Sequence, residues 1–480
     1  MSKKKENKGI LVATVSVVST SIFPWIVLFF NNIGSITIAD AYKSLLVLIG
    51  FGLSLLLLIW AITRSVHKAA IIASISVFML SNFSLIENGF LKISPSLYYW
   101  HVLIIVVFLI VTIGFLVNAY LKEDLAQKFV QGILMIFSIL LIVNIFMAMP
   151  DIFKILKQDQ SLASEREGIT PSDISTENDL TRPNVYYFIF DEYGGIENLK
   201  RYTDFENIEF IQDLEDFGFA VSPDSRNKTT DTFTEIPNLL QLDEVNTIEM
   251  TANAKKETSR DPRLLIEMAQ LGYEINVLQP PSYPFIDESY ADYLYVADKG
   301  TTFRTFDSYI YEKTAYYPFY SRTDQDNEIQ EMEAMFSYAE ESVSLSPSNL
   351  FTVGYFVFPH LPYIVDENGN KTSSVIRTDL KNPYAYLAQL KYANKKILHM
   401  VTTILNSQPE AIIVLQSDHG LRLPSHLHYW YGEDIYDLDI ESEYERNILN
   451  AVYFAGESIE ISGLDGMTTL KLVLDRLVSP

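Results

Sequence analysis

The sequence contains no cysteine among its 480 residues. This absence excludes disulfide bonds, thiolate metal sites and cysteine nucleophiles, and it leaves the redox compartment of the protein open. Basic residues are also few, because 36 Lys and Arg stand against 60 Asp and Glu, which gives a formal net charge of −24. Proteins that bind nucleic acid need a basic surface. The composition therefore argues against a nucleic-acid partner.

Charge and hydrophobicity divide the chain into two parts. Residues 1–150 contain 10 Lys and Arg against 5 Asp and Glu, a net charge of +5, so residues 151–480 carry −29. A helix needs about 20 apolar residues to cross a hydrocarbon core of about 30 Å. Five apolar segments lie in the first part, at about residues 9–30, 44–63, 69–86, 99–121 and 129–149. Residues 1–150 are therefore predicted to be a transmembrane domain, with 69–86 as its weakest span.

The cations between these segments predict how the spans are oriented. Lysines precede the first segment, Arg64 and Lys68 follow the second, and Lys122 and Lys128 follow the fourth, whereas the other two loops hold fewer cations. Loop cations stay on the cytoplasmic side of a membrane. Five spans satisfy this rule, with the amino terminus inside and residue 150 outside, and four spans would break it. We therefore expect a multi-pass protein with five spans.

Residues 151–184 are predicted to be a polar linker, because they are rich in Ser, Asp, Glu and Thr. After residue 184, short apolar runs alternate with amphipathic stretches. The expected strands are 185–190, 218–222, 273–278, 291–296, 349–358, 410–416 and 449–454, and the expected helices are 205–216, 262–271, 325–344, 383–406 and 467–478. This alternation predicts an α/β domain at residues 185–480, with a mostly parallel sheet flanked by helices.

Polar side chains follow several of these strands at the point where open α/β sheets bind their ligands. The unbroken apolar run Val185–Phe190 is typical of a strand buried on both faces. The polar groups concerned are Asp191 and Glu192 after the run 185–190, Thr232 and Glu235 after 218–222, His360 in a Pro-His-Leu-Pro loop after 349–358, and Asp418 with His419 after 410–416. These residues are the candidates for a site.

Each candidate also has a purely structural interpretation. Asp418 and His419 can belong to a plain turn, but a carboxylate and an imidazole that meet Asp191 from a neighbouring strand are suitable metal ligands, and the buried context favours the metal. Thr232 and Glu235 match a capping box, and a helix start is also a phosphate site. His360 can be an ordinary packed histidine. His426 and His428, near Arg422, are expected to be solvated loop residues, although they can line the site.

Six segments together carry a resemblance to a known family. They are the strand ending in Asp191, the segment Thr232–Leu240 with Pro237, the segment Phe358–Gly369 with His360, the segment Tyr386–Asn394, the pentapeptide Gln416–Gly420, and the segment Arg446–Ala451. In this order they resemble the membrane-bound sulfatase-like hydrolases and transferases of the alkaline phosphatase superfamily. Lipoteichoic acid synthases and phosphoethanolamine transferases have a similar plan, with spans first and an outer catalytic domain after them.

The resemblance implies an α/β alkaline-phosphatase/sulfatase-like fold and a set of roles. Asp191, Thr232, Asp418 and His419 would hold one divalent metal ion, Mn, Zn or Mg. Thr232 would also be the nucleophile that carries a phosphoryl intermediate, and His360 would assist the transferred group or the leaving oxygen. The substrate would be a membrane lipid or a cell-surface glycan of the cell envelope, and the catalytic domain would lie outside the bacterial cytoplasmic membrane.

The sequence departs from the family pattern at some positions. Formylglycine-type sulfatases need a Cys/Ser-x-Pro-x-Arg motif, and Ser222-Pro-Asp-Ser-Arg226 has the wrong spacing, so sulfate-ester hydrolysis is not expected. Glu192 stands where many relatives have Gly or a second Asp, which argues against a second metal ion. Thr229 and Thr230 are rival nucleophiles, and only the spacing to Pro237 favours Thr232.

We therefore expect metal-dependent transfer or hydrolysis of a phosphoryl head group, of the phosphoglycerol or phosphoethanolamine type. The alternative is a catalytically inactive sulfatase-like membrane protein that binds a surface glycan or an assembly partner. Convergence of Asp191, Thr232, Asp418 and His419 on one ion would favour the enzyme, and scattered positions would favour the binding protein.

Overall fold

The structure is a computed structural model. It describes residues 3–31, 38–93, 99–165, 181–245, 262–280, 283, 285–297, 310–311, 313–373, 381–431, 436–455 and 457–478. The chain forms two compact units. The first unit comprises Met1–Ser161 with Arg304–Ser321, and the second comprises Leu162–Phe303 with Arg322–Pro480. Each unit is considered by itself.

The described part of the first unit is mainly helical. Its helices are α1 (Lys3–Asn31), α2 (Ile38–Thr63), α3 (Val66–Ser81), α4 (Phe83–Ile93), α5 (Tyr99–Tyr120) and α6 (Glu123–Glu165). Four helical stretches are long and apolar enough to cross a membrane, namely Asn7–Asn31, Ala41–Thr63, Tyr99–Tyr120 and Glu123–Pro150. The third expected span, 69–86, is divided at Asn82 between α3 and α4, and α3 is only 16 residues long. At about 1.5 Å per residue α3 extends about 24 Å, less than a hydrocarbon core, so the fifth span stays a prediction.

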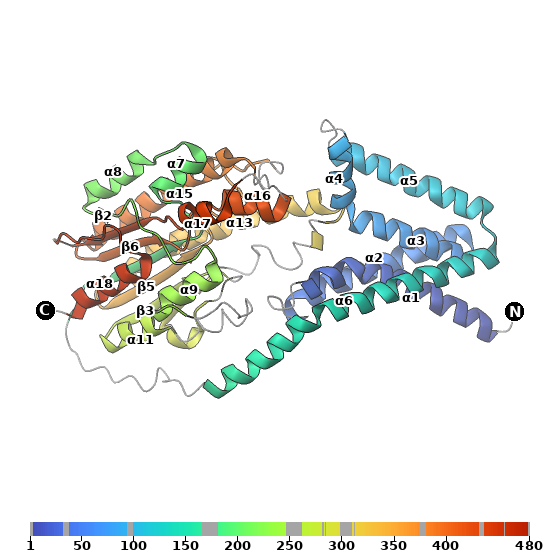
Figure 1. The fold of residues 1–480 in the computed structure, drawn as a ribbon, viewed down its shortest axis with the longest axis horizontal. Helices are drawn as coiled ribbons and strands as arrows, with labels where there is room; N and C mark the ends of the chain where they lie inside the picture. The colour runs from blue at the N-terminus through green and yellow to red at the C-terminus, as the bar shows by residue number, and fades with distance from the viewer. Residues whose placement is uncertain are drawn as a thin grey trace. The chain divides into compact units, whose positions relative to one another are not determined.

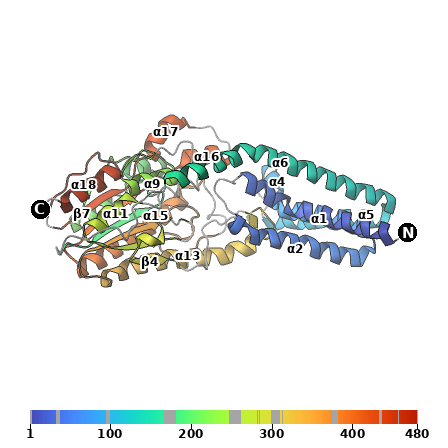
Figure 2. The ribbon, with the colours of Figure 1, turned by 90° about the horizontal axis from the view of Figure 1, so that it is seen from below.

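Helix α3 nevertheless lies among the other helices of its unit, beside α1 and α2 (Figure 1; Figure 2 shows the same unit turned by 90°). Small side chains allow this close approach, because Ala69, Ala70 and Ala73 are fully buried. Between α1 and α2, a Cβ added at Gly52 would lie 2.0 Å from Ser21 Oγ. The small residues of this unit therefore define its helix packing.

A short piece of the chain after β4 (Tyr293–Val296) belongs to the first unit. Ile310 is buried with Trp25 and Phe29 in one apolar cluster. The backbone N–H of Ala315 donates to the carbonyl of Leu80 at 2.8 Å. The sequence patterns assigned all of 185–480 to one domain and did not predict that part of it packs with the first unit.

Helix α6 continues past the apolar stretch to Glu165. The start of the expected polar linker, 151–165, is therefore helical, whereas residues 166–180 lie outside the described residues. The polar residues Lys, Gln and Glu are good helix formers, as is Ala. A polar composition alone did not distinguish a helix extension from a tether.

The second unit is built on a seven-stranded sheet with the order β2-β7-β6-β1-β5-β3-β4. The strands are β1 (Val185–Phe190), β2 (Ala220–Val221), β3 (Glu274–Gln279), β4 (Tyr293–Val296), β5 (Leu350–Phe356), β6 (Ile412–Ser417) and β7 (Asn450–Phe454). The sheet is mixed, because β7 runs antiparallel to both of its neighbours, β6 and β2, whereas the other four pairings are parallel. All seven strands coincide with expected runs to within a few residues.

Helices cover both faces of this sheet. They are α7 (Ile196–Thr203), α8 (Ile208–Phe217), α9 (Thr232–Gln241), α11 (Arg263–Gln270), α13 (Tyr317–Glu341), α15 (Pro383–Ser407), α16 (Leu423–Tyr431), α17 (Leu438–Glu445) and α18 (Gly466–Val478), with short 3₁₀ turns at Glu288–Tyr290 and Ser342–Ser344. Figure 1 shows α7, α8 and α15 on one face and α9, α11 and α18 on the other. Two apolar cores fill the layers between sheet and helices.

Strand β1 is the centre of the sheet and contributes to both cores. Tyr186, Phe188 and Phe190 belong to one core, and the residues between them belong to the other. This explains why β1 has no polar alternation. Phe190 pairs with Ser417 of the adjacent parallel strand β6. The next residue of each strand, Asp191 and Asp418, therefore leaves the sheet at the same edge.

Candidate metal centre

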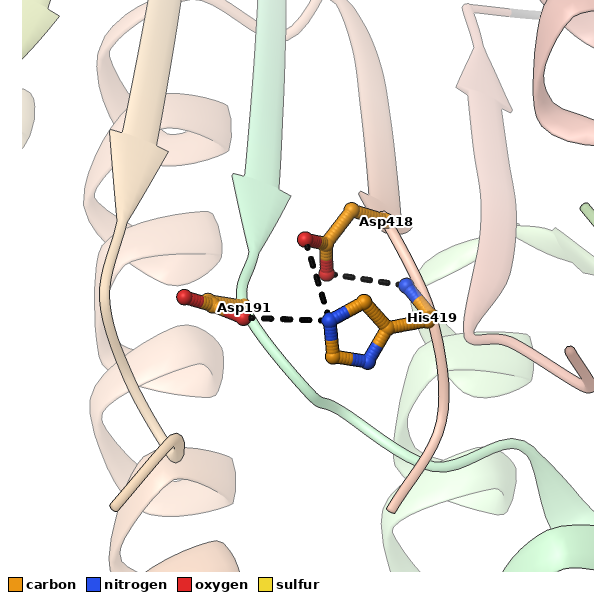
Figure 3. A group of neighbouring side chains, drawn as sticks. All are labelled: Asp191, Asp418 and His419. Atoms are coloured by element: carbon orange, nitrogen blue, oxygen red, sulfur yellow. Dashed lines mark hydrogen bonds and ion pairs between the residues drawn. The ribbon is translucent and has the colours of Figure 1, made fainter. Parts of the chain in front are cut away.

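Asp191, Asp418 and His419 converge at the carboxyl ends of β1 and β6 (Figure 3). All three side chains are buried, and their ligand atoms lie within 4.8 Å of one another. His419 Nε2 is 3.6 Å from Asp191 Oδ1 and 3.5 Å from Asp418 Oδ2. The backbone N–H of His419 and that of Glu192 donate to Asp418 Oδ1 at 2.8 and 3.2 Å, which fixes that carboxylate.

Thr232, on helix α9, completes the group. It is the first residue of α9, and it is buried. Its hydroxyl donates to Asp418 Oδ2 at 2.7 Å and lies 3.1 Å from His419 Nε2. The structure thus brings together all four residues that the sequence motifs proposed as a metal-binding set.

The capping-box interpretation of Thr232 is wrong. Asp231 precedes the helix as its N-cap, and Thr232 is already helical. The carboxylate of Glu235 reaches back further than a capping box requires, because it accepts the backbone N–H of Thr229 at 3.2 Å. The hydroxyl of Thr232 is directed to Asp418 instead, which leaves it available for chemistry.

His419 has a defined tautomer. Its Nδ1 lies 2.9 Å from the carbonyl oxygen of Gly420. A carbonyl can only accept, so Nδ1 carries the proton and Nε2 presents a lone pair to the cluster. Burial and then the positive charge of Arg422 lower the pKa of His419 well below its ordinary value, which keeps the ring neutral. A neutral imidazole is the form that binds metal.

Asp191, like His419, is held in place by a hydrogen bond with a group outside the cluster. Its Oδ2 accepts the hydroxyl of Tyr355 at 2.8 Å. Its Oδ1 is buried and has no hydrogen-bond donor within the described part of the chain. Burial, with the charge of Asp418 as the next cause, raises the pKa of Asp191 well above its usual range. Burial also raises the pKa of Asp418. These two carboxylates are therefore costly to ionise unless a cation lies between them.

When Asp191 is ionised, its orphaned Oδ1 and the lone pair of His419 Nε2 face each other, and neither can donate to the other. Such a pair is repulsive by itself and suits a cation held between them. Carboxylate oxygens, one imidazole nitrogen and a hydroxyl are ligands for Zn and Mn, and the oxygen-rich set also accepts Mg. The residues present therefore fit one divalent ion.

The rival hydroxyls near Thr232 have other partners or no described contact with the cluster. Thr229 Oγ1 accepts the N–H of Asp231 at 3.1 Å, and Thr234 Oγ1 donates to Asp231 Oδ2 at 2.6 Å. Thr230 offers its carbonyl to Arg422 Nη1 at 3.0 Å. Of these threonines, Thr232 alone has a described hydrogen bond to Asp418.

His360 lies in a second cluster, around Glu192, rather than in the first. His360 Nε2 is 3.8 Å from Glu192 Oε2, and His426 Nε2 is 3.6 Å from Glu192 Oε1. Glu192 is fully buried, with a φ of 59° in the left-handed region that favours glycine. The expectation that His426 is a solvated loop residue is wrong: it is buried on α16. His428, on the same helix, is half-buried.

The remaining motif residues form the scaffold of the site. The hydroxyl of Tyr386 donates to the carbonyl of Glu192 at 2.8 Å and accepts the N–H of Gly194 at 3.0 Å. The amide of Gln389 donates to the carbonyls of Pro359 and His360 at 2.9 and 3.0 Å. These contacts fix the turn after β1 and the loop that carries His360.

Glycine and asparagine hold the turn after β6. A Cβ added at Gly420 would lie 2.6 Å from the carbonyl oxygen of Asn447, which explains the glycine after His419. The side-chain amide of Asn227 donates to the carbonyls of Ser417 and Asp418 at 3.0 and 2.8 Å. The sequence patterns did not indicate Asn227, because a lone asparagine in a polar loop has no distinguishing signal.

Comparisons with known proteins were made on the sequence and on the fold. No family model matches the chain, and no curated protein matches it. Solved structures do match. Lipooligosaccharide phosphoethanolamine transferase A from Neisseria meningitidis, an integral membrane protein, is 14% identical over 97% of this chain and 94% of that chain, with a TM-score of 0.43.

Two further solved structures match a smaller share of this chain. The C-terminal periplasmic domain of EcEptC from Escherichia coli, in complex with Zn, is 12% identical over 63% of this chain and 84% of that chain, with a TM-score of 0.43. The lipoteichoic acid synthase LtaP from Listeria monocytogenes is 12% identical over 64% of this chain and 76% of that chain, with a TM-score of 0.40. Phosphoethanolamine transferases and lipoteichoic acid synthases are also the proteins that the sequence motifs resemble.

Proposed function

We propose that this protein is a sulfatase-like phosphotransferase or phosphohydrolase that acts on a lipid or a cell-surface glycan. One observation carries the proposal: the Thr232 hydroxyl is hydrogen-bonded to Asp418 and faces the lone pair of His419, beside the orphaned oxygen of Asp191. A buried hydroxyl next to a set of metal-type ligands is the arrangement expected of an activated nucleophile.

Asp191, Asp418, His419 and Thr232 would hold one divalent ion, Mn, Zn or Mg. When bound there, such an ion supplies Lewis-acid activation of the Thr232 hydroxyl and neutralises the carboxylates. Tyr355 and the carbonyl of Gly420 keep Asp191 and His419 in position for it.

Thr232 Oγ1 attacks the phosphorus of a phosphodiester and forms a P–O bond. Its proton passes to Asp418 Oδ2, which already accepts that hydrogen at 2.7 Å. The P–O bond to the lipid alcohol breaks, and His360 protonates the leaving oxygen. Thr232 stands at the start of α9, where the positive end of the helix dipole stabilises the phosphoryl oxygens. A sugar hydroxyl or water then attacks the phosphorus and gives its proton to His360. The bond from phosphorus to Thr232 Oγ1 breaks, and Asp418 returns the proton to Thr232.

The first unit favours a lipid-borne donor. Its apolar helices are long enough to cross a membrane, and the loop cations orient five spans with the second unit outside the bacterial cytoplasmic membrane. A lipid with a phosphoglycerol or phosphoethanolamine head group is abundant on that face. The resemblance of the motifs leads to the same substrate class.

The test uses the full chain in vesicles of phosphatidylglycerol or phosphatidylethanolamine that carry a fluorescent acyl chain, with Mn²⁺ or Zn²⁺ added. Head-group transfer from either lipid releases fluorescent diacylglycerol, which is quantified by chromatography. Thr232→Ala is expected to reduce release by more than about a thousandfold. Thr234→Ser is the matched control, because the serine keeps a hydroxyl able to bond Asp231.

The lipid that gives diacylglycerol identifies the head group. If neither lipid is cleaved and the purified chain binds no divalent ion, the proposal fails and a glycan-binding or assembly role replaces it. Equal release by the wild type and Thr232→Ala would show that Thr232 is not the nucleophile.

A further inference from the structure

Arg422 is a charged residue of the site that takes no part in the reaction steps above. It follows β6 by a few residues and stands just before α16. Its backbone N–H donates to Glu192 Oε1 at 3.0 Å, and its Nε lies 4.0 Å from the same oxygen. Its Nη1 donates to the carbonyl of Thr230 at 3.0 Å. The residue therefore connects the turn after β1 with the loop that leads to Thr232.

The guanidinium of Arg422 keeps free donors. An arginine has five N–H donors, and one described side-chain hydrogen bond, to Thr230, is made. Its Nε is buried and has no hydrogen-bond acceptor within the described residues. The side chain as a whole is 23% exposed, so its outer edge is accessible to a ligand. A buried donor without an acceptor is costly, and an incoming oxygen would remove that cost.

The buried carboxylates of the site attract a further cation. Asp191, Glu192 and Asp418 are three buried carboxylates at neighbouring strand ends. One divalent ion would leave a net charge of −1 among them, and such a site repels a phosphodiester. Arg422 supplies the missing positive charge, and the attraction of Glu192, Asp191 and Asp418 raises its pKa. With Arg422 present, a single ion is sufficient to make the site neutral before the anion enters.

We propose that Arg422 binds the phosphoryl group, with its free N–H donors directed to a non-bridging oxygen of the substrate. This inference rests on the proposed function for the identity of the ligand. Arginine suits the task because its planar fork makes two charge-assisted hydrogen bonds to one phosphate, which a lysine cannot do. Arg422 then serves where a second metal ion would otherwise be needed.

The experiment measures binding of inorganic phosphate to the full-length protein in detergent, loaded with Mn²⁺ or Zn²⁺, by titration calorimetry. The variants are Arg422→Met, which keeps the length without the charge, and Arg422→Lys, which keeps the charge without the fork. Arg201→Met is the matched control, because Arg201 pairs with Glu441 away from the cluster. Metal affinity, by competition with a chromophoric chelator, and the apparent Tm are measured on each.

Arg422→Met is expected to weaken phosphate binding by about tenfold or more, the size of a lost charge-assisted hydrogen bond. Arg422→Lys is expected to recover part of this loss, and Arg201→Met to show none. Metal affinity should stay the same or rise in Arg422→Met, because a positive charge beside the ligands is gone.

Unchanged phosphate affinity in Arg422→Met, or no phosphate binding by the wild type, would overturn the inference. A joint fall in phosphate affinity, metal affinity and apparent Tm that lysine does not relieve would also overturn it, since it would assign Arg422 to holding Thr230. Phosphate binding needs no turnover. The inference can therefore stand if the vesicle assay gives no product, and it can fail alone if the assay succeeds.

Discussion

At the scale of the residue, the site depends on atoms that lack suitable partners. Asp191 Oδ1 has no donor among the described residues, and the nearest atom of the cluster, His419 Nε2, presents a lone pair to it at 3.6 Å. The sequence motifs located these residues because each follows a buried strand. They did not locate Tyr355, because a tyrosine inside the apolar run of β5 is indistinguishable from a core residue until the fold directs its hydroxyl to Asp191.

Tyr355→Phe removes only that hydroxyl. Asp191 then loses the hydrogen bond that orients it. Removing the hydrogen-bond partner of a metal ligand typically lowers the metal affinity tenfold or more. We expect the dissociation constant for Zn²⁺ or Mn²⁺ to rise about tenfold, measured by chelator competition on the full chain. Tyr283→Phe, an aromatic neighbour of Tyr355, is the control. Equal affinities of Tyr355→Phe and the wild type would remove Tyr355 from the site.

Metal affinity should depend on pH in a definite direction. Burial and the charge of Asp418 raise the pKa of Asp191 above its usual value of about 4. An incoming ion must displace that proton, so affinity falls as the pH is lowered through the raised pKa, while His419 stays neutral and adds little. Calorimetry in two buffers of different ionisation enthalpy should detect proton release on binding. Affinity that does not fall as the pH is lowered, or binding that releases no proton, would contradict the raised pKa.

At the scale of the element, the sequence predicted every strand and five of the nine α-helices described in the second unit, but not their relation at the site. Helix α16 was expected to be a loop because it is short and contains two histidines and a proline. The reversed strand β7 has the same apolar pattern as a parallel one, so its direction could not be predicted. The convergence of α9 with β6 is set by tertiary packing, which no local pattern reports.

Helix α15 positions the His360 loop through one side chain. Gln389 is fully buried, donates to carbonyls of the loop and accepts the N–H of Ile364 at 2.7 Å. Gln389→Leu keeps the volume but leaves these groups unpaired, at about 1–3 kcal/mol for a buried polar group. We expect a lower apparent Tm and reduced diacylglycerol release, whereas the exposed control His399→Gln on the same helix should change neither. A fully active Gln389→Leu would show that the loop does not need α15.

At the scale of the whole molecule, the apolar helices come first in the chain and the α/β sheet follows, which is the order that charge and hydropathy predict. Two features of the molecule were not predicted from the sequence. Residues such as Ile310 and Ala315 return to the helical unit, and the long α6 runs beyond its apolar stretch. Neither has a compositional signal, because one is a short segment of ordinary residues and the other is a polar extension of an apolar helix.

The number of spans can be tested cleanly because the chain has no cysteine. Single cysteines at Gly89, which is exposed on α4, and at Asp124, which is exposed at the start of α6, are labelled with a membrane-impermeant maleimide in spheroplasts. Five spans predict labelling at 89 and protection at 124. Four spans, with α3 not crossing, predict the reverse pattern. An exposed position in the second unit, Glu457→Cys, should be labelled in the five-span case.

The central claim is that Thr232 carries the phosphoryl group, and peptide mass spectrometry tests it most directly. The full chain is incubated with Mn²⁺ or Zn²⁺ and with phosphatidylglycerol or phosphatidylethanolamine, quenched in acid and digested. The account predicts a peptide with a phosphoglycerol or phosphoethanolamine adduct on Thr232, absent from Thr232→Ala and retained in Thr234→Ser. An adduct on Thr229 or Thr230, or none on a metal-loaded protein that still releases diacylglycerol, would contradict it.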